Sequence, residues 1–398
     1  MASIIDYMKK NKDTSFDDLA LNDADILSLN EIGYIPFGEV LEPAFDLSQE
    51  LTLRDVLEHY EGKRDKLDYN FIMTKERVDL LEEMISSQRF ADLRLSHYVN
   101  DVDNELEKQF AAMIFRIPKI NHTQIVFRGT DDTMVGWKED FKLTYMREIP
   151  AHRSAIAYLK NYLSLHEDKV LVSGHSKGGN LAVYAVSHLP SELQDKIAQV
   201  YMFDAPGLHE AEVTLQSYQN IRDRLKVIRP EESIVGVMLN IDVEQEVVES
   251  QSFGVFQHAA TRWQVSEETG DFVPAEKPTD LSLNLQQTFK QWTDELSNQE
   301  LKALFDTVFD NLIDNGFLSL NELSHFNRES ATTLFNVFNS LNAINEDKKN
   351  LMSKSAKLFF AAFAGNFKVA KIEAPKLNLP ALPDFPDWEE IKSKFDKK

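Results

Sequence analysis

The chain has 398 residues, of which 43% are hydrophobic and 27% are charged. These are ordinary values for a globular protein, so they exclude wholesale disorder and collagen-like repeats. The balance of 43 Lys and Arg against 65 Asp and Glu gives a formal net charge of −22, a field that repels phosphate backbones and disfavours nucleic acid as a partner. The absence of cysteine excludes disulfides, thiolate nucleophiles and cysteine-ligated zinc.

The start of the sequence lacks the basic-then-apolar order of a secretory signal. No window reaches the roughly 18 to 20 apolar residues that a membrane-spanning helix needs. We therefore expect a cytoplasmic protein without an integral membrane segment.

Residues 1–104 are predicted to form a mostly helical, acidic N-terminal extension, which could act as a cap. Stretches 25–32 and 77–85 carry apolar residues at the three- and four-residue spacings of amphipathic helices. A Gly- and Pro-containing segment, 33–38, separates them.

Residues 105–275 have the texture of an α/β core. Two β-rich runs, 110–117 and 123–128, are joined by a short turn, as in a hairpin. Apolar strands then alternate with helices. Helices are predicted at 152–166 and 180–188, and strands at 169–173, 198–203 and 225–229, with an edge strand at 245–249. This alternation is typical of a mostly parallel sheet covered by helices on both faces.

Residues 276–398 are predicted to form a C-terminal helical region that ends in a proline-rich tail. Amphipathic helices are expected between 281 and 370. Four prolines follow between 375 and 386, and they predict an extended segment.

The strongest motif is Gly-His-Ser-Lys-Gly at 174–178, which fits G-x-S-x-G and lies between a predicted strand and a predicted helix. A serine on this sharp turn sits in strained backbone, and Gly174 and Gly178 remove side chains that would collide there. The competing interpretation is a phosphate-binding loop, but that needs Gly-Lys-Ser/Thr in the opposite order. Ser176 is therefore the predicted nucleophile.

An acyl-transfer site also needs two donors for the oxyanion. The N–H of Lys177, at the start of the helix after Ser176, is one candidate. The second is Thr130, in the Gly-Thr turn that follows the strand at 123–128. The alternative is that this turn is an ordinary one, with Arg128 in a structural ion pair.

These motifs resemble the class 3 lipases of the α/β-hydrolase superfamily and, more closely, the bacterial Mbeg1-like (DUF2974) family. The resemblance rests on residues 127–132, 136–141, 174–180, 203–207, 233–236, 257–258 and Trp263. It implies an α/β-hydrolase fold and an ester hydrolase. Ala205 departs from the family pattern, which has glycine there, and Glu231 and Glu232 stand where uncharged residues are expected.

Such a hydrolase needs an acid and then a histidine after the serine in chain order. Of the histidines after Ser176, His258 follows the last predicted strand in a loop, which is where the general base belongs. The other three are less suitable: His188 is too far along the helix, His209 lies only five residues after Asp204, and His325 lies among the C-terminal helices. Asp204 directly follows the strand at 198–203. The class 3 pattern places the acid one strand later, near Glu232 or Glu231, whereas the Mbeg1-like resemblance favours Asp204.

The sequence thus predicts a serine-dependent ester hydrolase with a Ser176–His258–Asp204 triad, acting on a neutral acyl ester or lipid without metal or cofactor. Trp137 and His175 are candidate residues of the pocket. Two other interpretations stay open: a non-catalytic α/β-hydrolase scaffold that binds a ligand or partner, and a thioesterase or amidase.

Overall fold

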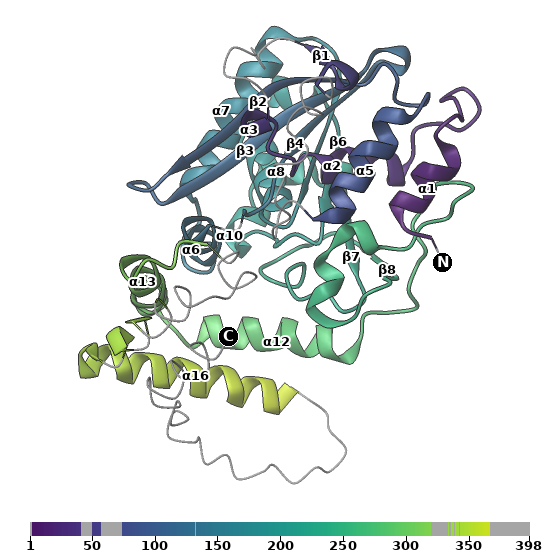
Figure 1. Cartoon of the computed structure of the whole chain (residues 1–398). Helices are drawn as coiled ribbons and strands as arrows, with labels where there is room; N and C mark the ends of the chain where they lie inside the picture. The colour runs from purple at the N-terminus through teal and green to yellow at the C-terminus, as the bar shows by residue number, and fades with distance from the viewer. Residues whose placement is uncertain are drawn as a thin grey trace, which may run out of the picture.

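The protein is described by a computed structural model (Figure 1). The structure describes residues 2–40, 50–56, 74–131, 133–319, 333, 336–337, 339–341 and 343–366. Its centre is an eight-stranded sheet in which the strands follow one another in chain order. The strands are β1 (Leu51–Thr52), β2 (Arg94–Asp103), β3 (Lys108–Ile117), β4 (His122–Phe127), β5 (Val170–His175), β6 (Ile197–Phe203), β7 (Leu225–Pro230) and β8 (Gln245–Val248).

The sheet has an antiparallel part and a parallel part. β1 to β4 pair antiparallel, and the predicted hairpin is confirmed as β3 and β4, joined by the 3-10 turn η2 (Pro118–Ile120). β4 to β8 pair parallel. Parallel neighbours need long crossovers, and helices fill those that precede β5, β6 and β7. The predicted α/β fold, with a mostly parallel sheet flanked by helices, is confirmed.

Helices cover both faces of the sheet because successive strand side chains point to opposite sides. Val126 packs in one apolar cluster with α1 (Ile4–Asn11), α2 (Asp23–Ile32) and α5 (Lys75–Ser86). Its neighbour Ile125 packs in the other cluster, with α7 and α8. The bounds of the latter two are Pro150–Leu165 and Lys177–Ser187.

The N-terminal segment contributes more than the predicted helices. The helices predicted at 25–32 and 77–85 are confirmed as α2 and α5, but β1 and β2 also lie before residue 105 and extend the sheet (Figure 1). The sequence hides β2 because most of its residues after Ser96 are partly or fully exposed and polar. Without an apolar run, a half-exposed strand gives little signal.

The described residues of the C-terminal region lie mostly in helices. α12 (Asp280–Asp294), α13 (Asn298–Asp314) and α16 (Glu346–Asn366) pack together, and α13 also packs against α6 (Met134–Lys142). Their shared apolar cluster includes Trp292, Phe305 and Phe309. The proline-rich tail lies outside the described residues. None of the helices in the described ranges is both long and apolar enough to cross a bilayer.

Candidate active site

Ser176 lies at the turn between β5 and α8. Its backbone has φ 57° and ψ −133°, a conformation that residues other than glycine rarely adopt. Such strain costs about 1–3 kcal/mol and persists only where the surroundings fix it. Here the Ser176 N–H donates to the Phe203 carbonyl at 2.9 Å, and the Gly179 N–H donates to the Ser176 carbonyl at 3.0 Å. The strand-turn-helix context that the motif predicts is therefore present.

The two motif glycines allow a contact closer than any side chain would permit. A Cβ on Gly174 would lie 2.0 Å from the carbonyl carbon of Gly178. A Cβ on Gly178 would lie 2.0 Å from the carbonyl oxygen of Phe127, at the end of β4. The glycines thus let the two ends of the turn approach each other and let the turn pack against the neighbouring strand β4.

A third glycine, Gly179, directly follows the motif, and its neighbour in space is Ala205. A Cβ on Gly179 would lie 2.5 Å from the Ala205 Cβ. Such a Cβ would also lie 2.8 Å from the Gly174 carbonyl oxygen, so α8 can pass the end of β6 at this point only with glycine.

His258 ends the short 3-10 helix η4 (Gly254–His258), and its Nδ1 lies 2.6 Å from Oδ2 of Asp204. Asp204 follows β6, and its side chain is completely buried. Its other oxygen accepts hydrogen bonds from the Ser233 hydroxyl and, at 3.1 Å, from the Gly236 N–H. Burial alone would raise the pKa of Asp204, but the hydrogen bonds from His258 and Ser233 hold that pKa below its ordinary value.

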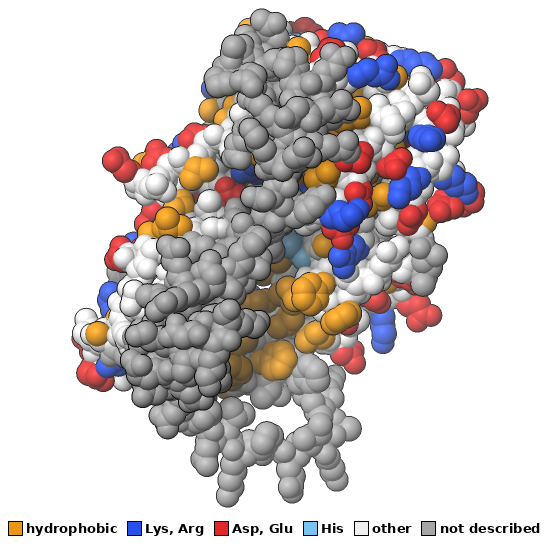
Figure 2. Space-filling view, viewed as in Figure 1, with side chains coloured by type: hydrophobic (Ala, Val, Ile, Leu, Met, Phe, Trp, Pro, Cys, Tyr) orange, Lys and Arg blue, Asp and Glu red, His pale blue; other side chains and the backbone are white. Residues whose placement is uncertain are grey.

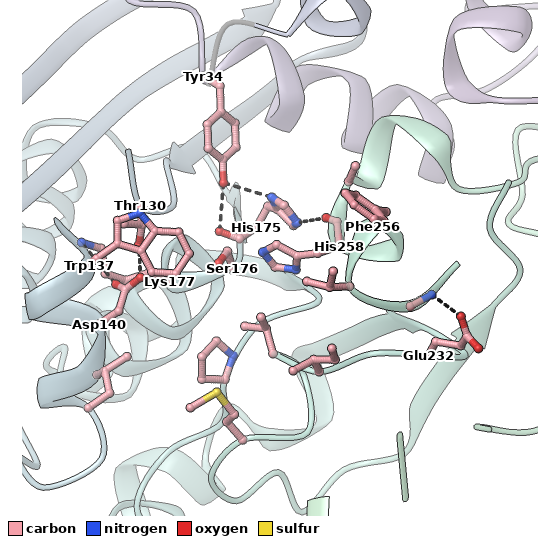
Figure 3. Close-up of a pocket in the computed structure, with 18 of the residues that line it drawn as sticks. Tyr34, Thr130, Trp137, Asp140, His175, Ser176, Lys177, Glu232, Phe256 and His258 are labelled. Atoms are coloured by element: carbon pink, nitrogen blue, oxygen red, sulfur yellow. Dashed lines mark hydrogen bonds and ion pairs between the residues drawn. The ribbon is translucent and has the colours of Figure 1, made fainter. Parts of the chain in front are cut away.

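The partner of His258 is neither of the two alternative acids, Glu231 and Glu232. The Glu232 carboxylate accepts a hydrogen bond from the Gly254 N–H, and in Figure 3 it points away from the His258 ring. Within the described part of the chain, neither it nor Glu231 has a hydrogen bond or ion pair with His258. The structure therefore brings Asp204 to His258 and keeps both glutamates apart from it.

The other histidines after the serine are also used elsewhere. His188 Nε2 lies 3.3 Å from a Glu212 oxygen, and His209 Nε2 lies 3.0 Å from the Met146 carbonyl oxygen. His325 falls outside the described residues.

Ser176 and His258 border the same pocket, at the carboxyl ends of the parallel strands (Figure 3). The pocket has a volume of about 740 Å³, within the range of small-molecule sites. Most of its wall is apolar, formed by Tyr34, Trp137, Phe141, Leu143, Pro206, Ile234, Val235, Met238, Leu239, Val255, Phe256, Ala259 and Phe289. Figure 2 shows hydrophobic side chains gathered beside a histidine on this face.

Charged side chains of both signs also line the pocket. Arg262 donates to Glu76 at 2.6 Å, and Arg77, Asp140, Lys177 and Glu232 are further lining residues. The wall is therefore mostly apolar, with a few charged groups among its lining residues.

The predicted oxyanion loop lies against the serine. A Cβ on Gly129 would be 2.6 Å from the His175 carbonyl oxygen and 3.1 Å from the Ser176 Cβ. Within the described residues, no hydrogen bond occupies the backbone N–H of Thr130 or of Lys177, the first residue of α8. Both residues line the pocket beside Ser176.

The side chain of Lys177 has a structural role that the sequence does not predict. It is 1% exposed, and its Nζ donates to the backbone carbonyl and the side-chain amide oxygen of Gln109 and, at 3.0 Å, to Glu139. The buried Glu139 carboxylate also accepts from the backbone N–H groups of Gln109 and Ala151. This network ties the first residue of α8 to β3, α6 and α7, and thereby holds the helix end of the turn in place.

The two predicted pocket residues, Trp137 and His175, both line the cavity. Asp140 lies beside Trp137 and accepts a hydrogen bond from the Thr130 hydroxyl, which holds the oxyanion loop. Burial raises the pKa of Asp140 to about 6. No cluster of three or more His, Asp or Glu in the described ranges is arranged to hold a metal ion.

Comparison with known proteins identifies the family. The profile of the Mbeg1-like family matches residues 84–310. Among solved structures, the M37 lipase is similar over 80% of this chain and 97% of its own, with 12% identity and a TM-score of 0.33, a likeness too weak to carry an argument. No curated protein matches the sequence. Because the profile covers more than half of its length, the chain belongs to the Mbeg1-like family.

Proposed function

We propose that this protein is a serine-dependent, lipase-like ester hydrolase. One observation carries the proposal: Ser176, on a strained strand-to-helix turn, shares an apolar pocket with His258, whose other side is hydrogen-bonded to buried Asp204. A nucleophile, a base and an acid that orients the base are the parts of this chemistry.

The geometry assigns a role to each group. Since Asp204 accepts the Nδ1 proton of His258, the Nε2 of that ring is left to act as base. His258 takes the Ser176 hydroxyl proton as the serine oxygen attacks the acyl carbonyl. The N–H groups of Thr130 and Lys177 then hold the oxyanion.

The second half of the reaction repeats these steps with water. Protonated His258 gives its proton to the leaving alkoxide, so that the alcohol departs and an acyl-serine is left. Water, deprotonated by His258, attacks this ester and releases the acid. Asp204, whose pKa lies below its ordinary value, stays ionised throughout and stabilises the imidazolium.

The pocket wall points to a substrate with an apolar acyl group. It offers phenylalanine, leucine, valine and methionine side chains, and most of its lining residues are apolar. The net charge of −22 opposes the approach of anionic substrates. Neutral esters or lipids therefore fit best, whereas a thioester, an amide or a bound ligand without reaction are the other outcomes of the test.

The test is covalent labelling of the intact protein with a fluorophosphonate probe, followed by mapping of the labelled residue. We expect stoichiometric labelling of Ser176, its loss in Ser176→Ala, and its retention in Ser187→Ala, a control on the same helix whose hydroxyl bonds to Tyr184. Absence of labelling, or labelling that survives Ser176→Ala, would overturn the proposal. A series of p-nitrophenyl esters, thioesters and anilides then distinguishes the leaving group and the chain length.

A further inference from the structure

The residue before the nucleophile, His175, lies between the N-terminal segment and the proposed base. Its side chain is 3% exposed, and its ring centroid lies 5.8 Å from that of Tyr34 and 4.5 Å from that of His258. Its Nδ1 is 3.0 Å from the Tyr34 hydroxyl, and its Nε2 is 2.9 Å from the His258 carbonyl oxygen (Figure 3). Both ring nitrogens are thus engaged, on opposite sides.

The chemistry of the partners fixes where the protons lie. A carbonyl oxygen only accepts, so Nε2 of His175 carries the proton and donates to the backbone of His258. Burial, with the positive charge of Arg77, holds the pKa of His175 well below its ordinary value, so the ring is neutral and Nδ1 accepts. Burial also raises the pKa of Tyr34 and keeps its hydroxyl protonated, so this hydroxyl donates to Nδ1 at 3.0 Å, the nearer of its two acceptors; the His175 carbonyl oxygen lies at 3.4 Å.

The His258 carbonyl, which accepts a hydrogen bond from His175, is one of the two last carbonyls of η4. The last carbonyls of a helix have no partner within it. The Gln257 carbonyl accepts from the indole N–H of Trp263 at 2.8 Å, and the next carbonyl, that of His258, accepts from His175. On its other flank the same turn is exposed, with Phe253 and Phe256 at 75% and 62%. Two buried ring N–H groups therefore anchor the turn that carries the base.

Tyr34 connects this anchor to the N-terminal segment. It lies two residues beyond the end of α2, and the Arg77 guanidinium of α5 stacks 3.6 Å from the centroid of its ring. Arg77 is in turn paired with the buried Glu31 of α2 at 3.0 Å. The tyrosine hydroxyl is thus held in place by both helices.

We propose that His175 and Tyr34 are positioning residues for the hydrolysis, which fix His258 through its backbone carbonyl so that its ring meets both Ser176 and Asp204. The proposal rests on the proposed function. It adds that the N-terminal segment takes part in orienting the base. A displacement of about 1 Å in a catalytic group can lower the rate about a hundredfold, so the anchor should affect kcat rather than substrate binding.

The main experiment compares two replacements of His175 in the full-length protein. His175→Phe keeps the ring volume but lacks the donor, and we expect kcat for a p-nitrophenyl ester to fall about 10- to 100-fold with KM little changed. His175→Gln offers an amide N–H near the position of Nε2, and it should recover much of that loss. The downfield proton resonance of the His258–Asp204 hydrogen bond should weaken in the Phe variant and return in the Gln variant.

A milder pair covers the case in which His175→Phe does not fold. Tyr34→Phe removes the hydroxyl that lies 3.0 Å from the His175 ring and 3.4 Å from the His175 carbonyl oxygen, and it should lower kcat several-fold. Tyr201→Phe is the matched control, since this buried hydroxyl also contacts the N-terminal segment, at Asp23 (2.9 Å), but not His175 or His258. It should lose a similar amount of stability and keep its kcat.

The outcomes separate the two proposals. Wild-type protein that the fluorophosphonate probe does not label at Ser176 overturns the hydrolase and the positioning role together. Wild-type labelling with unchanged kcat in His175→Phe, or in Tyr34→Phe where the former does not fold, overturns the positioning role alone. So does a Gln variant no better than the Phe variant.

Discussion

Asp204 is held as an ionised carboxylate in a completely buried place, by three donors from different parts of the chain. His258 binds one oxygen, and Ser233 and Gly236 bind the other. Each hydrogen bond to a charged group offsets part of the cost of burying it. The carboxylate can therefore stay charged beside the histidine without solvent.

This arrangement predicts the effect of Asp204→Asn. An amide in this place loses the charge that orients His258, so under the proposed mechanism kcat should fall about 10⁴-fold. The measurement is the steady-state hydrolysis of a p-nitrophenyl ester. Glu232→Gln is the control, because its oxygen can still accept from the Gly254 N–H and should keep most of the activity. A larger loss in the control than in Asp204→Asn would contradict the choice of acid.

At the scale of the element, the turn between β5 and α8 depends on the absence of a side chain. Gly178→Ala would place a methyl group 2.0 Å from the Phe127 carbonyl oxygen, in backbone that cannot move aside. We expect the free energy of unfolding to fall by at least about 3 kcal/mol, with loss of activity. Unfolding in denaturant measures this change in the free energy of unfolding.

Gly365 in α16 provides the contrast. Nothing lies within 4 Å of a Cβ built there, so Gly365→Ala should stabilise the protein, by up to about 1 kcal/mol from helix propensity. Equal effects of the two substitutions would contradict the steric argument.

The start of α7 gives a pH-dependent prediction. His152 Nδ1 accepts from the Ile149 N–H, and its Nε2 donates to Asn180, while burial lowers its pKa to about 3. Since histidine in the unfolded chain takes up this proton near its ordinary pKa of 6.5, the contribution of His152 to stability is complete above that pH. It is lost as the pH falls from there towards 3.

His152→Phe keeps the stacking on Tyr184 but cannot titrate. At pH 7.5 we expect it to unfold about 2 kcal/mol more easily than wild type, because two buried polar groups lose their partner. The gap should narrow by about 1–3 kcal/mol at pH 4.5. Urea unfolding at both pH values measures it, and a gap independent of pH would refute the assignment.

At the scale of the whole molecule, a buried lysine joins the C-terminal helices to the core. Lys138 of α6 is 3% exposed and pairs with Glu107, at the turn before β3, and with Asp310 of α13. Burial alone would raise the pKa of Glu107, but hydrogen bonds from Lys138 and Lys142 hold that pKa below its ordinary value of 4.5. The stabilisation is therefore present above that pH and is lost as the pH falls through the lower, folded value.

Lys138→Met should reduce the free energy of unfolding at pH 7 by about 2 kcal/mol, less than a fully buried pair would lose, because Asp310 is half-exposed. It should also make α13 more accessible to limited proteolysis. Lys142→Met is the control, since Lys142 pairs with Glu107 and does not reach α13. Equal proteolysis of the two variants would contradict the bridging role.

The sequence by itself determined the α/β core and the turn that carries Ser176. Both are local: an apolar run of five or six residues predicts a buried strand, and the spacing of Gly174 and Gly178 around the serine predicts the turn. It also named Asp204 and His258, but it left Glu231 and Glu232 as alternative acids. Chain order limits where an acid can be without specifying which carboxylate reaches the ring.

Only the tertiary structure decided what meets across the chain. Tyr34 and His175 are 141 positions apart, and the loop of His258 is a further 83 away, yet one imidazole contacts both. The buried pairing of Lys177 with Glu139 and the polar strand β2 were likewise without a signal in the sequence. Such contacts depend on how the crossovers bring strand ends to one edge of the sheet, and local propensity and periodicity do not encode distances between distant residues.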